Sequence, residues 1–172
     1  MGDAAHLLRR FVGSLRPGGP TPSEQAWVDA QLLPAERALW RRMSGPDRRH
    51  AARVAREVEC ALGHDATRPV VAAALLHDIG KVESGLRTYG RVVATVCGKV
   101  AGPETAHTWR KQRGFTRRVG LYLLHPDIGA DLLALAGSDP LTVAWTREHH
   151  LSPSDWTLPA PLAEALKAAD DD

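Results

Sequence analysis

The sequence predicts an all-α domain. Hydrophobic residues recur at helical spacing through most of the chain, and alternating, strand-like segments are scarce. Proline and glycine stand at points where helices would begin or end. With 172 residues, the chain has the length of about one domain and can bury a proper core.

The first 43 residues are predicted to form an N-terminal helical extension. Apolar spacing predicts a helix over residues 5–15, which the Pro- and Gly-rich residues 17–20 would end. Residues 21–24, Thr-Pro-Ser-Glu, then have the pattern of a capping box with Pro at the first helical position. Another helix is expected from Pro34 to about Met43.

Residues 44–172 are predicted to form the functional domain. Its first helix is expected to start at residues 44–47 and stop near Gly63, and the next to start at residues 67–69. Residues 82–120 are less regular, and glycines are expected to break them into short pieces at Gly85, Gly90, Gly98, Gly102 and Gly114. Helices are expected to return after Phe115, with prolines near three helix starts, at Pro126, Pro140 and Pro159.

Composition excludes several functional classes. An apolar fraction of 44% is ordinary for a soluble protein, and a net charge of +2 gives little reason to expect a nucleic-acid or membrane partner. Cys60 and Cys97 do not form a CxxC motif, which disfavours a thiolate zinc site or a redox dithiol. No apolar run approaches the roughly 18 residues of a membrane helix, and the N-terminus does not resemble a signal peptide. We therefore expect a cytoplasmic protein, without a prediction of its oligomeric state.

His77-Asp78 is the most informative feature of the chain. The dyad ends the apolar run of residues 70–76 and is followed by Ile79-Gly80-Lys81. An ionised aspartate is rarely buried unless it is paired or binds a metal. A metal site is therefore the first hypothesis, and the remaining ligands must come from elsewhere in the chain.

The other candidate ligands share a place on the inward face or at the end of a predicted helix: His50, His125, His149, His150 and Asp170. Taken singly, His50 could be a buried core histidine with a hydrogen-bond partner, and His125 could be a helix cap. The pair at 149–150 could simply interact with the dipole at the end of its helix. Asp170, unlike Asp171, continues the stripe of Leu162 and Leu166. Adjacent side chains diverge by about 100° on a helix, so His149 and His150 could both be ligands only where the helix unwinds.

Neutral imidazoles and ionised carboxylates are ligands for a hard to borderline divalent metal. The seven candidates exceed the needs of one ion. Two ions bridged by the Asp78 carboxylate, about 3.5–4 Å apart, would use all of them.

The order of these residues resembles the HD-domain superfamily of metal-dependent phosphohydrolases, over roughly residues 44–172: His50, then His77-Asp78 within LLHDIGK, His125 within HPDIG, His149-His150, and Asp170 within KAAD. The resemblance implies an HD-domain helical bundle. It also implies two sets of metal ligands: His50, His77, Asp78 and Asp170 for a first site, and His125, His149 and His150 completing a second. HPxxG and the paired histidines look most like the HD-GYP branch, which hydrolyses cyclic dinucleotides. Where that branch has HHE followed by DGxGYP, residues 149–156 read HHLSPSDW, which weakens the case for cyclic di-GMP as substrate.

The function implied by this resemblance is hydrolysis of a nucleotide or other small phosphoester by a metal-activated water. One or two divalent ions are expected, with Mn, Fe, Zn, Mg and Co all open. Asp78 would act as the catalytic bridging carboxylate, and Lys81 would bind a substrate phosphate or else be a solvated lysine at a helix end. A basic stretch would either attract a polyanionic nucleotide or form a solvated face: Arg110, Lys111, Arg113, Arg117 and Arg118. The alternatives are a non-catalytic metal- or nucleotide-binding regulatory module and, third, a di-iron oxygenase on the same scaffold.

Overall fold

The computed structural model describes residues 18–100 and 103–171, and that part of the chain contains helices and no strand. The prediction of an all-α fold is confirmed. In chain order the elements are α2 (Pro22–Gln31), α3 (Pro34–Arg42), α4 (Gly45–Leu62), the 3₁₀ helix η1 (Gly63–Asp65), α5 (Arg68–Leu76), the 3₁₀ helix η2 (Ile79–Ser84), α6 (Thr88–Val100), α7 (Pro103–Arg110), α8 (Gly114–Leu123), α9 (His125–Leu135), α10 (Pro140–Glu148), the 3₁₀ helix η3 (Pro153–Asp155) and α11 (Ala160–Asp171).

Helix starts follow the capping signals of the sequence. At α2, the backbone N–H of Glu24 donates to the Thr21 hydroxyl, and the Thr21 N–H donates to the Glu24 carboxylate at 2.7 Å, which completes the predicted capping box. The Ser44 hydroxyl caps α4, and the Asp139 carboxylate caps α10. The helix predicted over residues 5–15 lies outside the described residues.

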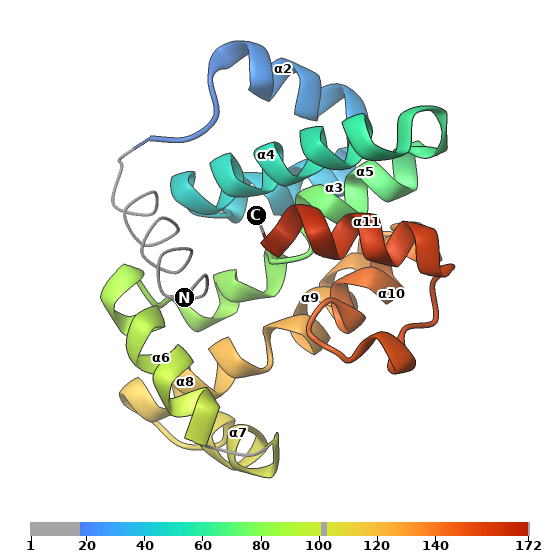
Figure 1. Cartoon of the computed structure of the whole chain (residues 1–172). Coiled ribbons are helices and arrows are strands. Elements are labelled where there is room, and N and C mark those ends of the chain that lie inside the picture. Colours follow the sequence, from blue (N-terminus) through green and yellow to red (C-terminus); the bar gives the residue numbers. More distant parts are fainter. Residues whose placement is uncertain (1–17, 101–102, 172) are drawn as a thin grey trace, which may run out of the picture.

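The main hydrophobic core surrounds α5. Every residue of α5 from Val70 to Leu76 is buried, and α4, α9, α10 and α11 contribute to the same core. Figure 1 shows α11 lying along α4, which brings the C-terminal end of the chain beside the start of the domain. Helices α2 and α3 add Val28 and Trp40 to this core. The boundary between residues 43 and 44 stays a prediction.

Helices α6, α7 and α8 form a separate part of the fold, here called the α6–α8 lobe. Figure 1 shows these three helices together, below the helices of the main core. Their own core is small, with Leu86, Ala94 and Val119 as its buried residues.

The glycines of this region do not all break helices. Gly85 and Gly114 do, with φ of 58° and 60°, in the left-handed region that glycine adopts readily. The prediction was wrong for Gly90 and Gly98, which lie inside α6. A Cβ atom on Gly98 would lie 2.6 Å from Cδ2 of Leu123, so this glycine allows α8 to approach. Gly102 lies outside the described residues. Within residues 18–100 and 103–171, no helix is both long enough and apolar enough to span a membrane.

Candidate metal centre

The His77-Asp78 dyad lies where α5 gives way to η2, and both side chains are buried. Gly80, two residues after Asp78, allows η2 to pack directly against the backbone of α9. A Cβ atom at this position would lie 2.0 Å from the carbonyl oxygen of His125 and 2.7 Å from the backbone nitrogen of Gly129. Only glycine therefore permits this contact between η2 and α9. The contact brings His125 to the dyad, with its Nε2 atom 3.3 Å from Oδ1 of Asp78.

Three buried histidines are oriented by the backbone in the same way. Each Nδ1 atom hydrogen-bonds a carbonyl oxygen three residues earlier: His77 to Ala74 at 2.9 Å, His125 to Tyr122 at 2.7 Å, and His149 to Thr146 at 2.8 Å. A carbonyl oxygen only accepts, so each Nδ1 carries a proton. The Nε2 atoms of all three rings are buried and have no hydrogen-bond partner. Orphaned Nε2 atoms on rings anchored through Nδ1 are the arrangement of metal-ligating histidines.

The first group of candidate ligands gathers at Asp170. His50 comes from α4, with its Nε2 atom 3.0 Å from Oδ1 of Asp170, and Nε2 of His77 lies 3.5 Å from the same oxygen. Ligand atoms of His50, His77 and Asp78 lie within 4.8 Å of one another, which suits a shared ion. As the helical stripe predicts, Asp170 faces this group, whereas Asp171 pairs with Lys167 at the surface.

The second group consists of His125, His149 and His150, whose ligand atoms also lie within 4.8 Å of one another. Helix α10 ends at Glu148, so the paired histidines follow its last turn. Both rings consequently approach His125, with centroid distances of 5.4 Å for His149 and 5.1 Å for His150. His149 itself still has helical φ and ψ and donates its backbone N–H to the carbonyl oxygen of Trp145, so the chain leaves the helix only after His149. His150 is the most exposed of the three.

Asp78 lies between the two groups. Its Oδ1 atom faces His125 at 3.3 Å and His149 at 3.8 Å, while its Oδ2 atom is 3.5 Å from Nε2 of His77. One carboxylate oxygen is thus directed to each group, as a bridging ligand requires. The bridging role itself stays a prediction.

Opposite charges dominate the protonation of the first group. Burial alone would lower the pKa of His77, but the carboxylates of Asp78 and Asp170 outweigh burial and raise this pKa to about 10. Burial would raise the pKa of Asp78, but Lys81 and His77 hold it well below its usual value. The pKa of Asp170 is likewise lowered, chiefly by His77 and His50 against the effect of burial.

The second group has the opposite balance. Burial lowers the pKa of His125, and it lowers that of His149 well below the usual value. Desolvation of its ring, with the charge of His125, lowers the pKa of His150 to about 4. These three imidazoles are therefore neutral near pH 7, which is the form that binds a metal.

Lys81 forms an ion pair with one of the candidate ligands, Asp78. Its Nζ atom is 2.5 Å from Oδ2 of Asp78, and only 14% of its side chain is exposed. Burial would lower the pKa of Lys81, but the Asp78 carboxylate raises it. Lys81 thus balances the charge of a buried carboxylate in this structure. Contact between Lys81 and a substrate phosphate stays a prediction.

The sequence model of the HD domain family matches residues 49–171, which is more than half of the chain. The chain belongs to the HD domain family. No curated protein and no solved structure matches the chain. All seven candidate ligands lie within the matched span of the HD domain.

The donor set of this HD domain fits a divalent ion. Five imidazoles and two carboxylates converge from α4, the end of α5, α9, the end of α10 and α11. Such nitrogen and oxygen donors suit Mn, Fe, Co or Zn, and carboxylates with water also suit Mg. Family membership and these two groups support a metal site, and the identity of the ion stays open.

Sequence reasoning missed one buried acidic residue beside the ligands. Glu148 directly precedes His149, and its carboxylate accepts two hydrogen bonds from Thr157. Its position before a histidine pair was the available signal. A charged residue at the end of a helix is usually solvated, and nothing in the spacing indicated burial.

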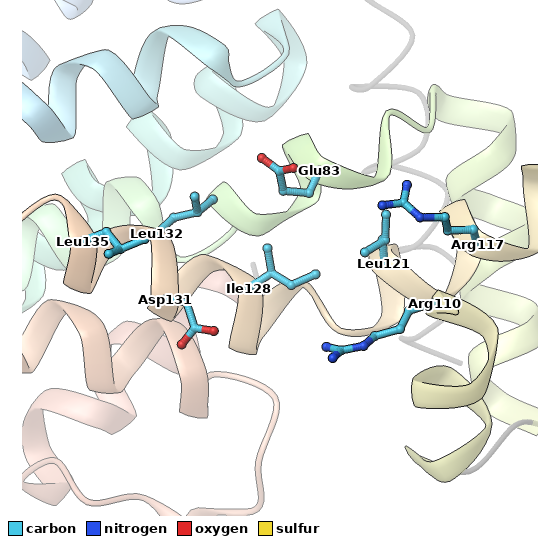
Figure 2. A pocket seen from close by; sticks show the side chains of 8 residues that line it. All are labelled: Glu83, Arg110, Arg117, Leu121, Ile128, Asp131, Leu132 and Leu135. Carbon is cyan, nitrogen blue, oxygen red and sulfur yellow. The ribbon is translucent and has the colours of Figure 1, made fainter. Parts of the chain in front are cut away.

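The basic stretch has divided roles. Arg118 donates to the carbonyl oxygens of Ser84 and Gly85 and so fixes the end of η2. Arg110 and Arg117 line a groove of about 460 Å³ beside α9, whose floor includes Ile128 (Figure 2). None of the seven candidate ligands lines this groove.

Proposed function

We propose that this HD domain is a metal-dependent phosphohydrolase that acts on a nucleotide or a related small phosphoester. The observation that carries the proposal is the pair of ligand groups on either side of Asp78, with three buried Nε2 atoms that face carboxylates and have no hydrogen-bond partner. Membership of the HD domain family supports the same chemistry.

In this proposal the first ion would be held by His50, His77, Asp78 and Asp170, and the second by His125, His149 and His150, with Asp78 between them. Bound divalent ions lower the pKa of a water molecule toward about 7 and neutralise phosphate oxygens. The protein supplies positioning. Because the anchored rings are already oriented, little reorganisation is needed when substrate binds.

The accessible side of the cluster indicates where substrate enters. His150 is exposed and His50 has 20% of its side chain exposed, whereas His77, His125 and His149 are buried. A phosphoester would therefore approach between His50 and His150. Lys81, which pairs with Asp78, would stabilise negative charge at this carboxylate and on the substrate.

The test combines metal analysis with a turnover assay. Protein purified without chelator should contain divalent metal at one to two ions per chain, and added Mn²⁺ should support hydrolysis of bis(p-nitrophenyl) phosphate, p-nitrophenyl phosphate or members of a nucleotide panel. A metal-loaded protein that binds nucleotide tightly but hydrolyses nothing would contradict the proposal and favour a regulatory module. Bound iron with oxygen consumption would favour a di-iron oxygenase.

A further inference from the structure

Glu148 is a buried carboxylate at the last position of α10, immediately before the two histidines of the second group. Only 7% of the residue is exposed. Its Oε2 atom accepts the backbone N–H of Thr157 at 2.7 Å, and its Oε1 atom accepts the Thr157 hydroxyl at 2.6 Å. Both oxygens are thus used by a single residue nine positions further along the chain.

These two hydrogen bonds close the segment that leads away from His150. Next to Thr157, the ring of Trp156 packs edge-on against Trp145, with centroids 5.8 Å apart. Trp145 in turn lies 6.5 Å from the ring of His149. The returning chain is therefore held against α10 by polar contacts at Glu148 and by an aromatic contact one turn earlier.

Among the described residues, the carboxylate of Glu148 is held by hydrogen bonds and not by an ion pair. Within residues 18–100 and 103–171, no lysine or arginine forms an ion pair with Glu148, so its charge rests on neutral donors alone. Burial of a charge without a counter-ion is unfavourable. The hydrogen bonds of Glu148 go to Thr157 and not to the last turn of α10, which indicates a role other than helix termination.

We propose that Glu148 is a positioning residue that holds His149 and His150 at the second ion by clamping Thr157. On a continued helix the two rings would diverge by about 100°. The clamp fixes the chain that leaves α10, so that both rings reach His125. This inference rests on the second ion of the proposed function.

Titration of metal-free protein with Mn²⁺, followed by calorimetry, tests the clamp without an activity assay. Glu148→Ala removes the clamp, and Thr157→Val removes its hydroxyl half while leaving the backbone donor. We expect either change to weaken the second ion by about 10–100-fold, the usual effect of losing a residue that orients metal ligands, with little effect on the first ion. Glu148→Gln should restore most of the affinity, because its amide can accept from the Thr157 N–H and donate to the hydroxyl. Glu164→Ala, at an exposed position of α11, is the matched control and should bind both ions as the wild type does.

Two results from the variants would overturn the clamp. One is unchanged affinity for both ions in Glu148→Ala and Thr157→Val. The other is equal weakening of both ions together with loss of helical circular dichroism in Thr157→Val, which would show a general structural role. A wild type that binds a single ion overturns the clamp but leaves a one-metal hydrolase. A wild type that binds two ions and hydrolyses nothing contradicts the proposed function and leaves the clamp to be judged by the variants.

Discussion

Gly80 in the main bundle and Gly98 in the α6–α8 lobe both allow a close approach, but they face different kinds of neighbour. In the bundle, Gly80 lies against the backbone of α9, where a Cβ atom would be 2.0 Å from a carbonyl oxygen. In the lobe, Gly98 lies against the end of the Leu123 side chain, which can move. The bundle supplies all seven candidate ligands and has the larger core, whereas the lobe leaves Val92, Val93 and Val96 exposed. The lobe has a close backbone contact too, since a Cβ atom on Gly120 would lie 2.5 Å from the backbone nitrogen of Arg110, but the contact at Gly80 is the one that brings a candidate ligand, His125, to the dyad.

The largest effect is expected at the residue shared by both groups. Asp78→Ala should abolish binding of both ions and reduce kcat/KM by about 10³-fold or more, because it removes the bridging carboxylate. Metal analysis and steady-state kinetics measure these losses. Asp171→Ala is the control, because Asp171 is an exposed carboxylate on α11, next to the candidate ligand Asp170. Retention of two ions in Asp78→Ala would show that the carboxylate does not bridge.

The two glycines give the most direct test of the comparison. Gly80→Ala should lower the free energy of unfolding by about 3 kcal/mol or more, since the new methyl group meets backbone that cannot yield. Gly98→Ala should change it by less than about 1 kcal/mol, because Leu123 can shift and alanine is the better helix former. Urea denaturation measures both. Equal losses for the two variants would remove the distinction drawn between Gly80 and Gly98.

A variant of His50 can distinguish between two roles for this residue, a metal ligand and a buried core histidine. His50→Ala should weaken metal binding by at least about 10–100-fold, the effect of losing even an indirect partner, while its helical circular dichroism stays that of the wild type. His64→Ala, which changes an exposed histidine just after the same helix, is the control and should bind metal normally. Unfolding of His50→Ala without loss of metal affinity would identify a core histidine.

Metal binding should also depend on pH. In metal-free protein, burial lowers the pKa of His77, but Asp78 and Asp170 outweigh it and raise the pKa to about 10, so this ring is protonated at neutral pH. An ion at His77 must displace that proton. Affinity should therefore rise with pH, by about tenfold per unit between pH 6 and 8 for each proton released. Calorimetry in buffers of different ionisation enthalpy measures the release, and its absence would place the metal elsewhere.

The smallest effect is expected on the surface of the lobe. Val96 is 60% exposed on α6, so Val96→Ser should alter the free energy of unfolding by no more than about 0.5 kcal/mol and leave metal affinity unchanged. Urea denaturation and metal titration of the same sample measure both. A large loss of either would show that the lobe is coupled to the metal centre.

Much of the bundle was predictable because its residues repeat at helical spacing. The stripe that placed Asp170 inward and Asp171 outward, and the start signals at Ser44 and Asp139, are local properties of the sequence. The structure places all the candidate ligands together, in two neighbouring groups. Their coordination of an ion stays a prediction.

What could not be predicted depends on contacts between segments distant in the chain. Nothing in the sequence near Gly98 reveals that Leu123 will pack against it, so the sequence predicts a helix break at this glycine. The Glu148–Thr157 contact joins residues nine positions apart, with a proline between them. Sequence spacing alone could not predict the direction of the Lys81 side chain. A lysine one turn beyond an aspartate can point to solvent or back onto the carboxylate.

The carbonyl oxygens that anchor His77, His125 and His149 belong to the main chain, three residues before each ring. A backbone oxygen persists whatever side chain its residue carries. Substitutions at Ala74, Tyr122 or Thr146 can therefore alter polarity and access around the rings without removing the acceptor that orients them. Variation among relatives at these three positions would tune the chemistry of the centre and preserve its geometry.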